Sequence, residues 1–294
     1  LVAVGFATLS AAYAVRAWRW QLLLNAEGRL GFGTVFWAMS LGYLGNNLLP
    51  ARMGEFVRTG IIAWKGRIGA PFVLVTALTE RLLDAGALVL VASIALATVP
   101  AMPEWLRRAA LGLSAGAVGG IVALAVLPRI ESFLLRCVAA LPGLGRMREG
   151  VKRLTSQLLL GMRPLHSPGR AARFAVSTAV IWSLDTLVAL ALARSMDIGM
   201  SPMAAIIVLA ALGLASSLPS TPGYLGIYQF VAVSVLPPFG IGPAPALAFV
   251  LLFQAVIYLV SIVSGVAGVF ALGAARRADP AAQASLDSSS AQRP

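Results

Sequence analysis

The chain has 294 residues, of which 59% are hydrophobic and 12% charged, and its formal net charge is +12. Soluble domains carry about 25% charged residues, and one hydrophobic core cannot bury this much apolar surface, so lipid must solvate part of the chain. The basic residues lie in short segments beside apolar runs, which is typical of membrane proteins and favours a membrane over nucleic acid as the partner. We therefore expect an all-α polytopic membrane protein.

Several segments are long and apolar enough to form membrane-spanning helices. A spanning helix needs about 20 apolar residues, because each residue rises 1.5 Å and the hydrocarbon core is roughly 30 Å thick. The segments that meet this criterion are 1–24, 71–99, 109–127, 172–194 and 244–273.

Two further apolar segments, 31–64 and 202–236, are interrupted by polar residues and proline. The breaks fall at 46–50 and at 216–223. The apolar stretch after each break would be only about 18–21 Å long as a helix, which is too short to cross a membrane. We therefore predict two re-entrant helical hairpins whose tips lie inside the membrane.

The basic residues predict an orientation. Arginine and lysine are concentrated between 129 and 173, which places that segment in the cytoplasm. Counting the predicted crossings from there puts the N-terminus outside, and Arg276 and Arg277 in the cytoplasm.

This orientation gives the two halves of the chain opposite topologies. Residues 1–99 and 172–273 each contain a helix, a hairpin and a second helix, which predicts an inverted-topology repeat. A linker helix and a basic cytoplasmic loop, 100–171, join them, so 1–273 would form a single transmembrane domain. The segment 274–294 is rich in Ala and Ser and is predicted to be a disordered cytoplasmic tail.

One predicted spanning segment, 71–99, contains Glu80, Arg81 and Asp84. Each charge inside a membrane costs roughly 2.5–3.5 kcal/mol, so these side chains should face protein or water and be paired. Glu80 and Asp84 share one helix face, and Arg81 is within reach of Asp84. The cluster is a structural salt bridge, a contact for substrate or a coupling ion, or both.

The first hairpin tip is followed by Arg52, Glu55 and Arg58. Guanidinium groups suit phosphate, which a lipid head group presents; alternatively, the three residues neutralise one another. Asp185 lies deep in 172–194 and requires a partner, for which an arginine of the other half is a candidate. It is either a proton or ion site or half of a structural pair.

Arg16 and Arg19 lie beside Trp18 and Trp20 in the first segment. This pattern favours snorkelling of both arginines towards the membrane interface, within an aromatic belt.

The candidate substrate-binding residues come from the two tips and the charged segments. They are Asn46, Asn47, Arg52, Glu55, Arg58, Glu80, Arg81, Asp84, Asp185, Ser217, Ser220, Thr221, Tyr228 and Gln229. A single cysteine and a single histidine argue against a metal site. Since the sequence has no nucleotide-binding motif, we expect no cofactor.

Four motifs carry a family resemblance. The sequences at 16–23, 46–58, 79–84 and 218–229 resemble the lysylphosphatidylglycerol synthase transmembrane-region family. The resemblance implies the flippase-like domain of bacterial synthases that make and translocate lysyl-phosphatidylglycerol. Related stand-alone members are linked to hopanoids and polyprenyl-linked sugars. No soluble synthase domain follows 244–273, and no catalytic motif is recognisable, so we expect a protein that is not an enzyme.

The leading hypothesis is a lipid translocase of the bacterial cytoplasmic (inner) membrane. It would move a phospholipid or another lipid-linked head group between leaflets through a polar cavity between the hairpins. Its partners would be membrane lipids, with anionic phospholipid head groups favoured, and a second copy of the chain or a lipid-modifying enzyme. The alternatives are an integral-membrane enzyme or accessory subunit acting on lipid-linked substrates, and a carrier of small solutes or ions.

Overall fold

The computed structural model describes residues 1–25, 28–97, 104–126, 129, 131–133, 136, 148–162, 167–216 and 221–277. Over these residues the chain is helical and has no strand, which confirms the all-α class. The elements are α1 (Val2–Leu24), α2 (Phe32–Leu48), η1 (Pro50–Arg52), α3 (Gly54–Gly66), α4 (Ala70–Ala97), α5 (Glu104–Val126), α7 (Arg148–Met162), α8 (Pro168–Ser195), α9 (Pro202–Ala215), η5 (Pro222–Tyr224), α10 (Ile227–Val235), η6 (Pro237–Phe239) and α11 (Pro243–Arg277).

The first interrupted segment folds into a helical hairpin, because α2 and α3 pack against each other. The chain leaves α2 at Leu49, whose backbone is extended, and Pro50 begins the short turn η1. Gly54 then starts α3 directly against α2. A Cβ atom at Gly54 would overlap the carbonyl oxygen of Gly42 and lie 2.6 Å from the amide nitrogen of Asn46. The close approach of the two helices therefore depends on Gly54.

The second interrupted segment forms a corresponding hairpin, in which α9 and α10 are in contact. Its tip contains η5, and Gly223 and Gly226 have φ of 64° and 87°, values that glycine tolerates far better than other residues. The carbonyl oxygen of Gly223 accepts hydrogen bonds from Gln254 Nε2 (2.9 Å) and from the Tyr258 hydroxyl (2.6 Å). These two bonds fasten the second tip to α11.

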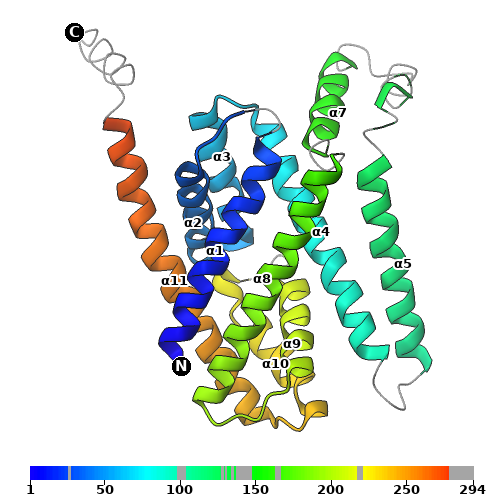
Figure 1. Ribbon diagram of the computed structural model, residues 1–294, viewed down its shortest axis with the longest axis vertical. Helices are drawn as coiled ribbons and strands as arrows, with labels where there is room; N and C mark the ends of the chain where they lie inside the picture. Colours follow the sequence, from blue (N-terminus) through cyan, green and yellow to red (C-terminus); the bar gives the residue numbers. More distant parts are fainter. Residues whose placement is uncertain are drawn as a thin grey trace.

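The two hairpins lie at opposite ends of the bundle. Figure 1 shows α2 and α3 in its upper half and α9 and α10 in its lower half. The tips η1 and η5 are in contact with each other, and α2 packs along α11 while α1 packs along α8. The two halves of the chain are therefore interlocked.

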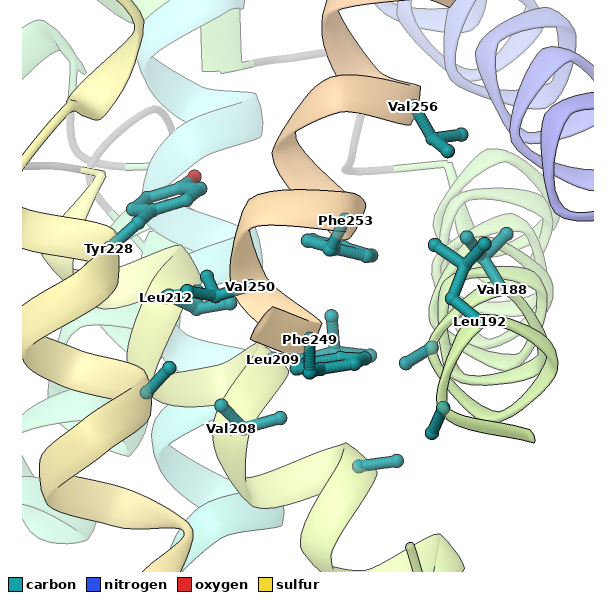
Figure 2. Packing of buried hydrophobic residues seen from close by; sticks show 14 of the residues in the cluster. Val188, Leu192, Val208, Leu209, Leu212, Tyr228, Phe249, Val250, Phe253 and Val256 are labelled. Carbon is teal, nitrogen blue, oxygen red and sulfur yellow. The ribbon is translucent and has the colours of Figure 1, made fainter. Parts of the chain in front are cut away.

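Each half has its own hydrophobic core, and α1 contributes to both. Leu9 and Tyr13 belong to the core built with α8 to α11, part of which Figure 2 shows around Phe249 and Phe253. One turn later, Ala17 and Trp20 belong to the core built with α2, α3 and α4. Arg16 lies where α1 passes from one core to the other.

Two helices, α8 and the Pro243–Ala274 part of α11, are long and apolar enough to cross a membrane among the residues that the structure describes. The helices α1 and α4 have sufficient length but contain the charged residues discussed above. Ser114–Ala123 within α5 and the whole of α9 are shorter apolar helices.

Two boundaries differ from those predicted. The segment expected to be a basic loop contains α7, which packs against α4: Leu159 is buried, and Gly161 adjoins Val75. The last helix continues through Arg277, beyond the predicted end at 273. The remainder of the predicted tail, 278–294, lies outside the described residues.

Candidate functional site

Nine charged side chains from both halves meet inside the bundle, and we call them the charged cluster. They are Arg16, Arg19, Arg52, Glu55, Arg58, Glu80, Arg81, Asp84 and Asp185. Helical spacing explains how single elements supply several of them, because Arg16 and Arg19 are three residues apart on α1, and Glu80 and Asp84 four apart on α4.

Arg19 lies at the centre of the cluster and is 1% exposed. Its Nη1 donates to Asp84 Oδ1 (2.6 Å) and to Thr178 Oγ1 (2.8 Å), and its Nη2 donates to Glu80 Oε1 (2.9 Å) and to Asp84 Oδ2 (2.7 Å). The guanidinium group also lies over the ring of Phe174, 4.8 Å from its centroid. Arg19 therefore connects α1, α4 and α8.

A second group of contacts surrounds Glu55 at the start of α3. Its carboxylate pairs with Arg58 (2.5 Å), Arg81 (2.9 Å) and, more distantly, Arg52 (3.6 Å). Arg58 also reaches Glu80 at 3.3 Å, which joins this group to Arg19. One carboxylate thus faces three guanidinium groups, and Arg52 has the longest of these contacts.

Asp185 on α8 forms a short hydrogen-bonded ion pair with Arg16 on α1. Asp185 therefore pairs with an arginine of the other half, which the sequence indicated as its candidate partner. Both residues line the polar cavity described next.

A cavity of about 180 Å³ opens beside the charged cluster, and we call it the polar cavity. Its lining includes Tyr13, Arg16, Tyr43, Asn46, Asn47, Arg52, Arg81, Asp84, Trp182, Asp185, Ser216, Tyr224 and Tyr228. Arg16 Nη1, Arg52 Nε, Asn47 Nδ2 and Trp182 Nε1 are buried donors with no hydrogen-bond partner among the described residues. A ligand with several acceptor oxygens could satisfy them.

Half of the sequence-predicted candidates line the polar cavity: Asn46, Asn47, Arg52, Arg81, Asp84, Asp185 and Tyr228. Glu55, Arg58 and Glu80 do not line it and are paired within the charged cluster. Ser217 and Ser220 lie outside the described residues.

Two candidates of the second tip make local contacts instead of lining the cavity. Gln229 accepts a hydrogen bond from the amide of Gly226 (2.7 Å) and donates to Gln254 of α11. The Thr221 hydroxyl donates to the carbonyl oxygen of Leu225 (2.5 Å). Both satisfy polar groups that the broken helix leaves free.

The structure corrects two sequence-based assignments. Arg16 and Arg19 do not snorkel: they point into the bundle, where Asp185, Glu80 and Asp84 compensate their charges. Arg81 pairs with Glu55 of α3 and forms no ion pair with Asp84 among the described contacts. The sequence did contain a reason to expect that Arg19 is buried and paired. Glu80 and Asp84 lie on one face of the segment 71–99 and need a cation from another segment.

The described residues contain no group of three or more His, Cys, Asp or Glu side chains that could hold a metal ion.

The interlocked hairpins, the buried charged cluster and the long apolar helices define a helical membrane protein with a polar site inside its bundle. A sequence model of the family described as lysylphosphatidylglycerol synthase TM region matches residues 1–265. The chain belongs to this family, which confirms the resemblance seen in its motifs.

One curated relative is Glycosyltransferase AglD of Haloferax volcanii, which is 25% identical to the chain over 307 residues. The alignment covers 92% of this chain and 49% of AglD, so the chain spans about half the length of that protein. No solved structure matches the chain.

This relative corrects the expectation that the chain is not an enzyme, because a protein that matches almost the whole chain is named a glycosyltransferase. That expectation rested on the lack of a recognisable catalytic motif and of a following synthase domain. About half of AglD lies outside the aligned region.

Proposed function

We propose that the chain binds the phosphate-bearing head group of a membrane lipid in the polar cavity and moves it between leaflets. The observation that carries this proposal is a charge imbalance. Five guanidinium groups face four carboxylates in the charged cluster. A buried surplus cation requires an anion, and the single negative charge of a phosphodiester would balance it.

Arg52 is the cation that remains available. It lines the cavity, its only ion pair among the described residues is the 3.6 Å contact with Glu55, and its Nε has no hydrogen-bond partner there. Guanidinium groups bind phosphate oxygens in bidentate fashion. Arg52, together with Asn47 and Arg16 of the same cavity lining, therefore forms the proposed phosphate site.

We further propose that both hairpins are re-entrant and that the halves form an inverted repeat. As helices of 13 and 9 residues, α3 and α10 are about 20 and 14 Å long, short of the roughly 30 Å hydrocarbon core. The hairpins lie at opposite ends of the bundle, and their tips are in contact (Figure 1). Backbone broken at membrane depth is tolerated where it lines a cavity, and such sites serve alternating access in transporters.

Cysteine labelling tests this topology. With Cys137 replaced by serine, single cysteines at Gly31 and Arg67 flank the first hairpin, and cysteines at Gly199 and Gly242 flank the second. We expect a membrane-impermeant maleimide to label the first pair only in inverted vesicles and the second pair only in intact cells. Labelling of the Gly31 and Arg67 positions from opposite sides would show that the segment from α2 to α3 crosses the membrane once, and would overturn the repeat.

Lipid flipping in proteoliposomes tests the transport function. Arg52→Gln removes a charge-assisted contact worth about 1.5–3 kcal/mol, so we expect flipping of fluorescent phosphatidylglycerol to fall at least about tenfold. Arg67→Gln is the matched control, because Arg67 shares the left-handed backbone of Arg52 but is exposed at the end of α3. Equal flipping by wild type and Arg52→Gln would remove Arg52 from the site.

A second candidate function is favoured by the similarity to AglD: the chain would be the membrane part of an enzyme that transfers a sugar to or from a lipid-linked substrate. The polar cavity would then hold the lipid phosphate during transfer. Sugar transfer to a polyprenyl phosphate by the purified chain, without lipid flipping in the same vesicles, would favour this function over translocation.

A further inference from the structure

A second cavity, of about 730 Å³, lies between α4, α8 and α9, and we call it the apolar groove. Its lining is mainly apolar and includes Leu83, Ala87, Val91, Leu187 and Ile206. Val91 and Leu187 are 42% and 56% exposed, so the groove is open at the surface of the bundle.

The hydroxyl groups in the groove do not make it polar, because each already donates within its own helix. Thr178 donates to the carbonyl oxygen of Phe174 (2.9 Å), Ser183 to that of Ala179 (2.8 Å) and Thr186 to that of Trp182 (2.7 Å). The Thr178 oxygen also accepts the hydrogen bond from Arg19. The groove therefore offers a ligand methyl, methylene and aromatic surface, which suits hydrocarbon.

The groove adjoins the polar cavity. Leu88, Trp182 and Leu209 line both. Trp182 lies at the junction, three residues before Asp185 on the same helix, and its indole N–H has no hydrogen-bond partner among the described residues. A buried indole N–H normally finds an acceptor, so its position at the boundary points to a ligand with an oxygen there.

We propose that the apolar groove holds an acyl chain of the phospholipid whose head group occupies the polar cavity, with Trp182 donating a hydrogen bond to an oxygen where chain and head group join. This inference rests on the proposed function and adds the route by which the hydrocarbon leaves the site. A phospholipid has the three parts that the surfaces require in order: an anion, ester oxygens and a long apolar chain.

Filling the groove tests this proposal. Ala179 lies on its wall and is exposed, so Ala179→Trp would occupy the space of a chain. Ala172→Trp is the control, because Ala172 is an exposed alanine of the same helix outside both cavities. The measurement is binding of dioleoyl-phosphatidylglycerol and of dihexanoyl-phosphatidylglycerol to purified protein, followed by native mass spectrometry. We expect Ala179→Trp to weaken binding of the long-chain lipid at least tenfold and that of the short-chain lipid less than twofold.

Two further variants separate this inference from the proposed function. Arg52→Gln reports on the head group and should weaken both lipids; if it weakens neither while Ala179→Trp still excludes the long chain, the phosphate site is wrong and the groove stands. Trp182→Phe keeps a ring and removes the N–H, and should weaken both lipids several-fold. Equal binding of the long-chain lipid by the Ala179→Trp and Ala172→Trp variants would overturn the groove, as would competition by a polyprenyl phosphate but not by phospholipid.

Discussion

Arg19→Leu is expected to destabilise the protein by about 3–5 kcal/mol, the usual cost of removing one partner from a buried ion pair. The substitution leaves Asp84 without an ion pair among the described contacts and removes one of the two arginines that face Glu80. It also removes the hydrogen bond that joins α1 to Thr178 of α8. Thermal unfolding in detergent, followed by fluorescence-detected size-exclusion chromatography, measures the effect.

The double variant Arg19→Leu/Asp84→Leu isolates the electrostatic part of this loss. The second substitution removes the carboxylate that Arg19→Leu leaves without an ion pair, so we expect the double variant to be more stable than Arg19→Leu alone. Arg29→Leu is the control, because Arg29 is exposed in the loop after α1, and surface substitutions usually change stability by less than about 0.5 kcal/mol. A double variant as unstable as the single one would show that Arg19 acts through packing against Phe174, and not through its charge.

The identity of many site residues could be predicted from the sequence because buried charge is costly in a membrane. Glu80, Asp84 and Asp185 stand in apolar segments where they need partners, and all three are paired in the structure. The arginine that pairs with each of these acids could not be predicted from the sequence in the same way. Sequence spacing reports only on neighbours within one helix, whereas Arg16 and Arg19 meet their acids because α1 packs against α4 and α8.

The same distinction explains Arg81 and Gln229. Local spacing places Arg81 beside Asp84, yet the position of α3 brings Glu55 within 2.9 Å of it. Gln229 was a candidate for the cavity wall, but the break at Gly226 leaves an amide that its side chain caps. A broken helix needs polar side chains for its own free backbone groups, so polar residues near a tip divide between structure and ligand, and the sequence alone does not separate the two uses.

Gly54→Ala is the second substitution from which we expect a large effect. The added Cβ would overlap the carbonyl oxygen of Gly42 and lie 2.6 Å from both the amide nitrogen and the side-chain oxygen of Asn46. The obstacle includes backbone as well as a side chain, so α2 and α3 must move apart. Overpacking of this kind typically costs about 1–3 kcal/mol or more. Because Asn46 takes part in this contact and lines the polar cavity together with Arg52, we expect lipid flipping to fall together with stability.

Gly60→Ala is the control that tests whether the effect comes from the contact between Gly54 and α2. Gly60 lies on the same helix, and a Cβ atom there meets nothing within 4 Å. Alanine is favoured over glycine inside a helix by roughly 0.5–1 kcal/mol, so Gly60→Ala should leave the unfolding temperature unchanged or raise it. Glycine-to-alanine substitution is thus expected to lower stability at Gly54, which lies against α2, and to preserve or raise it at Gly60, which does not. If Gly54→Ala and Gly60→Ala were equally stable and equally active, the close contact between the two helices would not hold the first tip. The position of Arg52 would then have to depend on the contact between η1 and η5.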